Sequence, residues 1–289
     1  MSKAIYSKNE PFYLNGKRAM VSLGPFSDKQ HCPYGCAFCY VQDDFSSYEK
    51  LSEDGIITFL KDRQDEYSII YVSGDTDSFA PPRTKRGVAL LLRIATELEC
   101  DLLFTTRTTF QEDDYRILRL VADEQRRKNK EFYACISITR YSEESAYLEP
   151  TPIPTPDARI AVLKKLKELG ATTVLAMRPF LPVVKMEDYM LILNKTEGFV
   201  DIALGENFYF IRDGKIQVRV FPNGISEEVN CELIHNQKMD FDNNTSSWEV
   251  WDSKKYQEAV RKRCDELGVV FSMHSDDAIA EFLHSKEGK

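Results

Sequence analysis

Three closely spaced cysteines are the residues of this sequence best suited to chemistry. Cys32, Cys36 and Cys39 lie within HCPYGCAFCY, at C-x3-C-x2-C spacing. Thiolates are the usual ligands of iron–sulfur clusters, and a compact loop lets several of them reach one cluster. Pro33 and Gly35 suit the tight backbone path that such a loop requires. Three ligands would leave one iron of a cubane cluster open to an outside ligand, as in catalytic rather than structural metal sites.

A zinc site and simple packing are the alternatives for these cysteines. His31 could serve as a fourth zinc ligand, but it adjoins Cys32, which strains coordination of one ion by both side chains. Cysteine is too uncommon for three structural ones to be expected within one loop, and closely spaced cysteines in a reducing cytoplasm more often bind metal or do chemistry than form disulfides. The spacing therefore favours an iron–sulfur site over both alternatives.

Charge and hydropathy limit the class of protein. The 289 residues hold 38 Lys and Arg against 46 Asp and Glu, a net charge of −8. A protein that coats nucleic acid would be basic, so bulk nucleic acid is not an expected partner. The N-terminus MSKAIYSKNE has no apolar secretion segment, and the longest apolar run, VALLL at 88–92, is too short to span a bilayer. We expect a cytoplasmic protein without membrane association.

Short apolar runs that alternate with helical patterns predict an α/β fold. Strands are expected at 19–23, 67–73, 102–106, 132–138, 172–177 and 199–204, and helices at 53–64, 84–98, 112–129, 156–169 and 186–196. Most of the strands are continuous apolar runs, as in parallel sheets covered on both faces. Such a series of βα units predicts a partial (β/α)6 barrel of the TIM type. The functional residues of these barrels lie on the loops after the strands, and the cysteine loop follows the first strand.

The pattern changes near residue 206, which predicts three parts. These are an N-terminal segment at 1–18, the partial barrel at 19–206 and a C-terminal α+β extension at 207–289. Within the extension, NFYFIRDGKIQVRVF (207–221) predicts a β-hairpin that turns at Asp213-Gly214. A helix, the short strand VVFSM and a final helix are expected over 253–285.

The motif CPYGCAFCY, placed after a first strand and opening a βα series, resembles the signature of the radical SAM superfamily. In that family three cysteines bind a [4Fe-4S] cluster, and the amino and carboxylate groups of S-adenosylmethionine (SAM) chelate its open iron. The resemblance implies Cys32, Cys36 and Cys39 as the cluster ligands. It also implies that Phe38 lies by the adenine of SAM, and Tyr40 fits the same pattern. The similarity covers about residues 19–205.

Three further stretches are similar to the spore photoproduct lyase-like group of this superfamily. They are SGDTDSFAP (73–81), FTTRTTF (104–110) and SITRYSEESAYLEPTPIP (137–154). One departure concerns a cysteine at the end of the second strand, which the lyase uses as a hydrogen-atom donor. The corresponding stretch here, YVSGDTD, contains none. The four remaining cysteines, Cys100, Cys135, Cys231 and Cys264, are typical of small buried hydrophobic residues.

The group resemblance implies contacts of SAM with the loops after three strands. The SAM amino group would meet Ser73, Gly74 and Asp75, and the SAM carboxylate would meet Arg107. A guanidinium suits bidentate binding of a carboxylate. Ser137, with Thr139 beside it, would meet the ribose or the methionine part. The alternatives are that the acidic loop residues cap the next helix and that Ser137 is a satisfied polar residue within a strand.

Cations recur at the expected functional ends of the strands. A local gathering of cations in an acidic protein would attract an anionic ligand. With Arg107 assigned to SAM, the candidates for a phosphate or carboxylate of a substrate are Arg83, Lys85, Arg140 and Arg178. The acidic residues on the same loops, Glu149 among them, could instead pair with these cations.

The family resemblance implies a radical enzyme. Its reduced cluster would pass one electron into SAM, releasing methionine and a 5′-deoxyadenosyl radical that abstracts a hydrogen atom from a substrate. A reductant such as flavodoxin or ferredoxin is an implied partner, and the substrate would be a small-molecule or nucleotide-like anion. Two alternatives are a DNA lesion repair enzyme of the spore photoproduct lyase type and a non-enzymatic zinc or iron–sulfur module used for interaction.

Overall fold

The computed structural model describes residues 12–15, 17–22, 32–39, 53–74, 76–226, 229, 231–238 and 245–287. The chain forms two compact units. Unit 1 comprises residues 1–34, 44–136 and 153–173, and unit 2 comprises residues 35–43, 137–152 and 174–289. None of the helices in the described ranges is long and apolar enough to cross a membrane.

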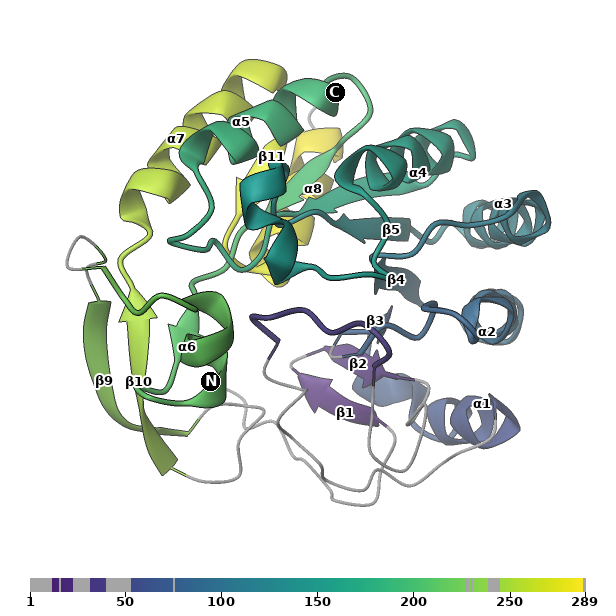
Figure 1. Ribbon diagram of the computed structural model, residues 1–289. Coiled ribbons are helices and arrows are strands. Elements are labelled where there is room, and N and C mark those ends of the chain that lie inside the picture. Colours follow the sequence, from purple (N-terminus) through teal and green to yellow (C-terminus); the bar gives the residue numbers. More distant parts are fainter. Residues whose placement is uncertain are drawn as a thin grey trace. The chain divides into compact units, whose positions relative to one another are not determined.

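Unit 1 is built on parallel strands. β1 (Phe12–Asn15) runs antiparallel to β2 (Arg18–Val21), and β2, β3 (Ile69–Val72), β4 (Asp101–Thr106) and β5 (Phe132–Ser137) then pair in parallel. Every residue of β3 and β5 is buried, which explains why these strands are uninterrupted apolar runs. Four helices lie along one side of these strands (Figure 1). They are α1 (Glu53–Lys61), α2 (Thr84–Glu97), α3 (Glu112–Arg127) and α4 (Pro156–Glu168).

Local sequence signals fix the ends of these helices. The Thr155 side chain accepts a hydrogen bond from the Ala158 N–H at the start of α4, and Pro156 occupies the first helical position. Gly170 follows α4 with a φ of +90°, in the left-handed region that favours glycine. α3 begins with a capping box in which Gln111 and Asp114 each bond the other's backbone N–H.

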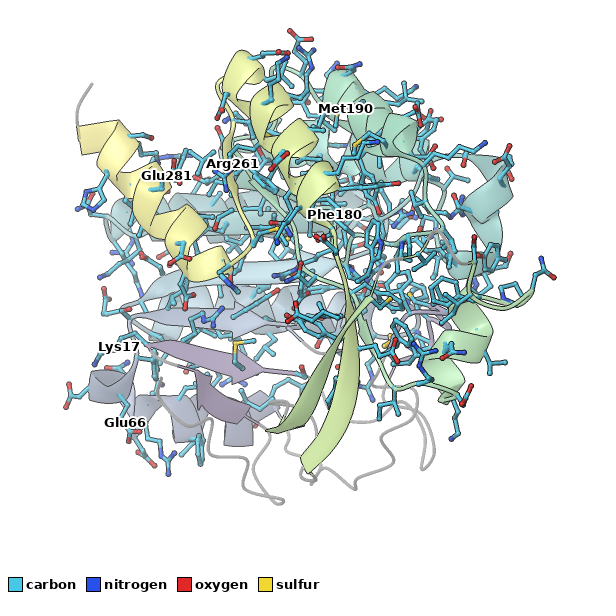
Figure 2. All side chains as sticks on the ribbon, turned by 90° about the vertical axis from the view of Figure 1, so that its left-hand side faces the viewer. Lys17, Glu66, Phe180, Met190, Arg261 and Glu281 are labelled. Carbon is cyan, nitrogen blue, oxygen red and sulfur yellow. The ribbon has the colours of Figure 1, made fainter. Side chains whose placement is uncertain are left out.

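Unit 2 continues the βα pattern. β7 (Ile202–Leu204) pairs in parallel with β6 (Thr172–Ala176) and with β11 (Val270–Ser272). The helices of this unit are α5 (Met186–Lys195), α6 (Lys215–Val220), α7 (Lys254–Leu267) and α8 (Ser275–Glu287). Figure 2 labels Met190, Arg261 and Glu281, which mark α5, α7 and α8. Arg261 ties α7 to β11, since its guanidinium donates to the Phe271 carbonyl at 3.2 Å.

A separate three-stranded antiparallel sheet also belongs to unit 2. Its order is β8 (Tyr209–Phe210), β10 (Thr245–Trp251) and β9 (Cys231–Lys238). Two short 3-10 helices complete the described elements, η2 (Gln64–Glu66) in unit 1 and η3 (Glu143–Leu148) in unit 2. Trp251 packs edge-on against Tyr256, with ring centroids 4.9 Å apart, which secures the start of α7.

The predicted hairpin at 207–221 is wrong. Only Tyr209 and Phe210 form a strand, and KIQVRV forms the helix α6. Asp213 has a φ of 59°, but the Gly214 N–H bonds back to the Ile211 carbonyl and Gly214 becomes the N-cap of α6. Ile216 and Val220 are buried while Val218 is 64% exposed, so burial follows helical i, i+4 spacing rather than strand alternation. The hairpin of this part of the chain is instead formed by β9 and β10.

The predicted fold class is confirmed. The main sheet has the order β1-β2-β3-β4-β5-β6-β7-β11, is not closed, and carries helices between its parallel strands. The predicted strand VVFSM is β11, which joins this sheet beside β7 and so extends the parallel series beyond the six strands expected.

Candidate active site

The cysteine loop lies between β2 and α1, and residues 32–39 of it are described. None of its three cysteines forms a disulfide within the described residues; Cys36 is buried, whereas Cys32 and Cys39 are partly exposed. A tight turn joins the last two, because the Cys39 N–H donates to the Cys36 carbonyl at 3.0 Å. The Ala37 N–H donates to the Leu148 carbonyl at 2.9 Å, which fixes this turn to the end of η3.

An arginine from α6 also holds this turn. The Arg219 guanidinium donates from Nε to the Ala37 carbonyl at 2.9 Å and from Nη2 to the Cys39 carbonyl at 3.0 Å. Arg219 is not among the predicted site residues, because a hairpin was predicted in place of the helix that carries it. A correct helix assignment would have placed Arg219 beside the buried Val220, but no signal in the sequence points to its partners.

Within unit 1, a network of hydrogen bonds joins the motif to two loops that follow strands. The Tyr34 hydroxyl lies 2.8 Å from the Thr108 hydroxyl, just after β4. The Thr108 N–H donates to the Thr106 hydroxyl oxygen at 2.9 Å, and the Thr106 hydroxyl in turn donates to the Asp77 carboxylate at 2.9 Å. The loops after β3 and β4 are therefore tied together at the carboxyl ends of the strands, next to the motif residue Tyr34.

Asp77 is the centre of this network. Besides the Thr106 hydroxyl, its carboxylate accepts the N–H of Phe79 at 3.0 Å and the N–H of Arg107 at 2.8 Å. Burial raises the pKa of this carboxyl, while the hydrogen bonds from Arg107 and Thr106 act in the opposite direction. The carboxylate thus fixes the backbone of the partly exposed Arg107, the residue that the resemblance assigns to the SAM carboxylate. The sequence suggested no role for Asp77 beyond capping the next helix or pairing with a nearby cation.

The loop after β3 has a specific internal structure. Ser73 has a φ of 73°, in the left-handed region, and its hydroxyl donates to the Thr76 carbonyl and accepts the Ser78 N–H at 2.7 Å. The hydroxyl therefore shapes the loop. A Cβ at Gly74 would lie 2.3 Å from the methyl carbon of Met20. Asp75 lies outside the described residues.

The predicted residues near the fourth strand are deeply buried. Ser137 ends β5, and Thr139, two residues later, donates from its hydroxyl to the Arg178 carbonyl at 3.4 Å. Phe38 is buried within the cysteine loop. Tyr40 lies outside the described residues.

The four candidate substrate cations differ in their surroundings. Arg83 is 8% exposed, and burial together with the charge of Arg86 lowers its pKa to about 10. Lys85 is exposed on α2, and Arg178 is partly exposed after β6. Arg140 instead forms a buried ion pair with Glu149, with Nε and Oε2 3.5 Å apart. For Arg140, the alternative to substrate binding is therefore the one observed: its guanidinium pairs with a carboxylate of its own loop.

Asp188 of α5 is a further residue that the sequence did not reveal. Its carboxylate accepts the N–H groups of Tyr141 at 3.0 Å and Ser142 at 2.9 Å, and also the Ser142 hydroxyl at 2.9 Å. The loop that follows β5 is therefore anchored to α5. This anchoring holds the segment that carries Arg140.

The cysteines outside the motif are structural in character. Cys100, Cys135 and Cys264 are buried, and Cys231 is partly exposed. Burial raises the pKa of the Cys100 and Cys264 thiols to about 12, so both stay protonated at neutral pH.

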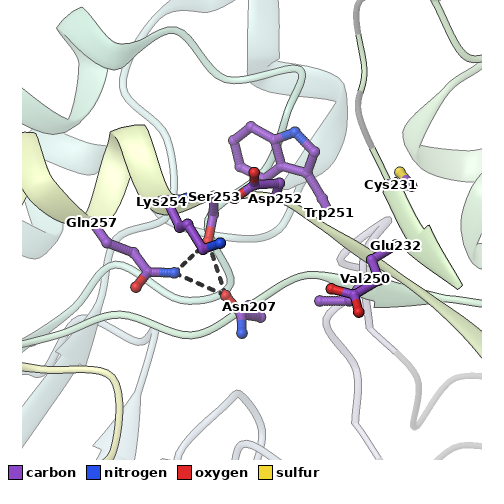
Figure 3. A pocket seen from close by; sticks show the side chains of 9 residues that line it. All are labelled: Asn207, Cys231, Glu232, Val250, Trp251, Asp252, Ser253, Lys254 and Gln257. Carbon is purple, nitrogen blue, oxygen red and sulfur yellow. Dashed lines mark hydrogen bonds between the residues drawn. The ribbon is translucent and has the colours of Figure 1, made fainter. Parts of the chain in front are cut away.

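A cavity of about 350 Å³ lies in unit 2 where β9 and β10 meet the start of α7 (Figure 3). At its polar side, Asn207 Oδ1 accepts the Ser253 hydroxyl at 2.9 Å and the Gln257 amide at 3.0 Å. These side chains satisfy one another, and the cavity lining contains none of the predicted site residues.

The donor chemistry of the loop fits an iron–sulfur cluster, with three cysteine side chains outside disulfides within residues 32–39. Cys32 belongs to unit 1 and the other two cysteines to unit 2. Over the described ranges, no three His, Cys, Asp or Glu side chains are gathered closely enough to hold one metal ion. Convergence of the three thiolates on one cluster is therefore part of the proposal made below.

An open parallel α/β sheet with a three-cysteine loop after its first parallel strand defines a partial-barrel protein equipped for iron–sulfur chemistry. A model of the radical SAM superfamily matches residues 28–195, more than half of the chain. The chain belongs to the radical SAM superfamily. Comparison with curated protein sequences finds no match.

Solved structures share the fold at low sequence identity. A spore photoproduct lyase variant with bound AdoMet and dinucleoside spore photoproduct is 14% identical with a TM-score of 0.64, covering 89% of this chain and 76% of that chain. Streptococcus suis SuiB bound to S-adenosylmethionine is 14% identical with a TM-score of 0.52, covering 69% and 42%. The radical SAM methyltransferase TsrM from Kitasatospora setae is 9% identical with a TM-score of 0.59, covering 95% and 63%.

Family membership confirms several predictions. The protein is an enzyme of the radical SAM superfamily, and its cofactors are a [4Fe-4S] cluster and SAM. Enzymes of this family need a reductant such as flavodoxin or ferredoxin. The similarity to the spore photoproduct lyase-like group is confirmed at the level of the fold.

Proposed function

We propose that this enzyme cleaves SAM reductively and uses the resulting radical to abstract a hydrogen atom from a small organic anion. Cys32, Cys36 and Cys39 would hold the cluster. The observation that carries the proposal is the network from Tyr34 of the motif through Thr108 to the loop of Arg107. It ties the predicted cluster loop to the predicted SAM carboxylate ligand.

The bound cluster would supply one electron from a low-potential donor to SAM, which yields methionine and a 5′-deoxyadenosyl radical. The contribution of the chain is to bind and orient the reactants. Arg107, held by Asp77, would pair with the SAM carboxylate, and Phe38 and Tyr40 would lie near the adenine. The amino group would meet the backbone of Ser73 and Gly74, with Asp75.

The end of β5 would complete the SAM site. Ser137 would face the ribose or the methionine part. The Thr139 hydroxyl is engaged with the Arg178 carbonyl, so we assign Thr139 the role of supporting Ser137 rather than binding SAM directly.

For the substrate anion, we propose Arg83, Lys85 and Arg178 as binding residues. The burial of Arg83 supports this role, because a cation kept out of water interacts strongly with an anion. Arg140 would instead stabilise its own loop through Glu149. We further propose that residues 19–206 carry the catalytic machinery, that residues 207–289 support it, and that the enzyme acts in the cytoplasm.

The test is anaerobic reconstitution with iron and sulfide, reduction, and detection of 5′-deoxyadenosine from SAM by mass spectrometry. The triple variant C32A/C36A/C39A is the matched control and should give none. A reconstituted, reduced wild-type protein that forms no more 5′-deoxyadenosine than this variant would contradict the proposal. A colourless protein that holds zinc would support the interaction-module alternative, because iron–sulfur proteins are brown.

The substrate can be searched with deuterium-labelled candidates, since label that enters 5′-deoxyadenosine identifies the abstracted hydrogen. Charge reversal by Lys85→Glu should raise KM for the anionic substrate roughly tenfold, the equivalent of about 1.4 kcal/mol. Lys164→Glu, at an exposed position of α4, is the control for net charge. Equal KM values for the two variants would contradict the proposal that Lys85 binds the substrate anion.

The shared fold with spore photoproduct lyase favours lesion repair as a second candidate function. A repair enzyme should convert a dinucleoside spore photoproduct and bind damaged DNA with strong salt dependence. The absence of a cysteine from YVSGDTD disfavours this reaction. A reconstituted enzyme that cleaves SAM but leaves the dinucleoside unchanged would eliminate it.

A further inference from the structure

Arg219 of α6 donates two hydrogen bonds to residues of the cysteine loop. Its two acceptors, the carbonyls of Ala37 and Cys39, flank Phe38 within the Cys36–Cys39 turn. Two parallel N–H donors from a planar guanidinium specify both the position and the orientation of such a pair of carbonyls. Lysine, a compact point charge on a flexible stem, cannot reproduce this fork.

The position of Arg219 is itself well fixed. Burial of Ile216 and Val220 holds α6 against the rest of unit 2. The Tyr147 hydroxyl also donates a hydrogen bond to the Val220 carbonyl at 2.9 Å. The next residue, Leu148, accepts the Ala37 N–H at 2.9 Å. η3 therefore contacts both α6 and the cysteine turn, and Arg219 joins these two directly. The guanidinium therefore belongs to a group of contacts in which α6, η3 and the cysteine turn each contact the other two.

The chemistry at this position concerns the cluster ligands. A loop that is ordered before the cluster binds loses less conformational entropy on binding, which favours retention of the cluster. A fixed positive charge near an iron–sulfur cluster also stabilises its reduced form, because reduction adds negative charge. The Arg219 side chain would produce both effects, the ordering of the loop and the stabilisation of the reduced cluster.

We propose that Arg219 is a positioning residue that orders the Cys36–Cys39 turn for cluster binding and raises the reduction potential of the bound cluster. The proposal rests on the proposed function, in which these cysteines are cluster ligands. It concerns the protein's control of its cofactor, and Arg219 is not required to touch SAM or substrate.

The experiment compares wild type with Arg219→Met, Arg219→Lys and the control Lys215→Gln, each reconstituted anaerobically as the full chain. Lys215 lies on the same helix and is exposed, so its variant removes one positive charge from α6 without altering the fork. The readouts are the rate of iron loss to a chelator and the midpoint potential by redox titration with EPR detection. Neither requires turnover.

We expect Arg219→Met to lose iron at least about tenfold faster than wild type, the scale measured for residues that orient metal ligands. Its midpoint potential should shift to more negative values. Arg219→Lys should keep the wild-type potential, because the charge is retained, but lose iron faster, because the fork is gone. Lys215→Gln should match wild type in the rate of iron loss.

Iron retention and potential in Arg219→Met equal to those of wild type would overturn this inference alone. A wild-type protein that holds no cluster would overturn the proposed function and this inference with it. Should Arg219→Met fail to fold, as judged by circular dichroism, Arg219→Lys decides the matter: iron loss at the wild-type rate would refute the positioning role.

Discussion

The backbone N–H of Arg107 donates a 2.8 Å hydrogen bond to the buried carboxylate of Asp77. This single bond links the loop after β3 to the loop after β4 and sets the direction in which the chain leaves β4. The side chain proposed to pair with the SAM carboxylate is therefore positioned by a residue that need not touch SAM.

Asp77→Asn should weaken SAM binding more than it weakens the fold. The amide supplies one acceptor oxygen and turns an N–H₂ group toward existing donors, so one of the bonds from Phe79, Thr106 or Arg107 is lost. We expect SAM affinity to fall roughly tenfold and stability to fall by about 1–3 kcal/mol. Isothermal titration calorimetry and urea unfolding measure the two effects. Asp113→Asn, at an exposed position of α3, is the control, and an unchanged Kd for Asp77→Asn would refute the positioning of Arg107.

Gly87→Ala should destabilise the protein even though alanine favours helices. A Cβ at Gly87 would lie 2.7 Å from the Ser78 carbonyl oxygen and 2.8 Å from a ring carbon of Phe79. The change should cost about 1–3 kcal/mol, because it pushes α2 away from the loop that carries Asp77. Gly74→Ala is the comparison, since its Cβ clashes only with the flexible end of Met20 and makes ordinary contact with the ring of Tyr71. Thermal unfolding distinguishes the two, and equal melting temperatures would contradict the packing argument.

The buried ion pair of Arg140 and Glu149 should behave as a coupled unit. Glu149→Gln leaves a buried guanidinium without its counter-charge and should cost about 3–5 kcal/mol. The double variant Arg140→Met with Glu149→Met should recover most of this loss, because it removes both charges at similar volume. Urea unfolding of Arg140→Met, Glu149→Met and the double variant gives the coupling free energy. Additive losses would show that the pair makes no net interaction and would reopen a substrate role for Arg140.

The stability of the protein should fall between about pH 9 and about pH 12, in part through Cys100. Its folded pKa of about 12 lies above the value of an unfolded thiol, so the unfolded chain releases this proton first as the pH rises. This contribution is fully present below the unfolded pKa and is lost toward the folded pKa, at up to about 1.4 kcal/mol per pH unit. Urea unfolding at several pH values should show a shallower decline for Cys100→Ala than for wild type. Thr96→Ala, a nearby exposed control, should keep the wild-type slope.

Much of the fold could be predicted because burial on both faces leaves a local record in the sequence. The strands β3 and β5 are apolar runs that no helix pattern fits, and Thr155-Pro156 and Gly170 mark the ends of α4. The hairpin prediction failed because Asp213-Gly214 suits both a two-residue turn and a helix start. Tertiary burial of Ile216 and Val220 decided between them.

The residues that support the site could not be predicted for a different reason. Cys32, Cys36 and Cys39 share a local spacing, which made them recognisable. Arg219, Asp188 and Asp77 act through backbone groups far away in the sequence, and the identity of a backbone acceptor leaves no trace in residue types. The pairing of β11 with β7, which makes β11 part of the main sheet, likewise could not be predicted, because the sequence of a three-residue strand does not specify its partner.

The contact between α6 and the Cys36–Cys39 turn has a consequence for engineering and for evolution. The two segments are joined by hydrogen bonds between residues 180 and 182 positions apart in the sequence, so neither can be exchanged independently of the other. A chimera that takes residues 32–39 from one parent and residues 215–220 from another would mismatch the guanidinium and the carbonyls it binds. Chimeras between related enzymes should therefore retain iron when both segments come from the same parent. C-terminal truncations that remove α6 should produce proteins unable to retain iron.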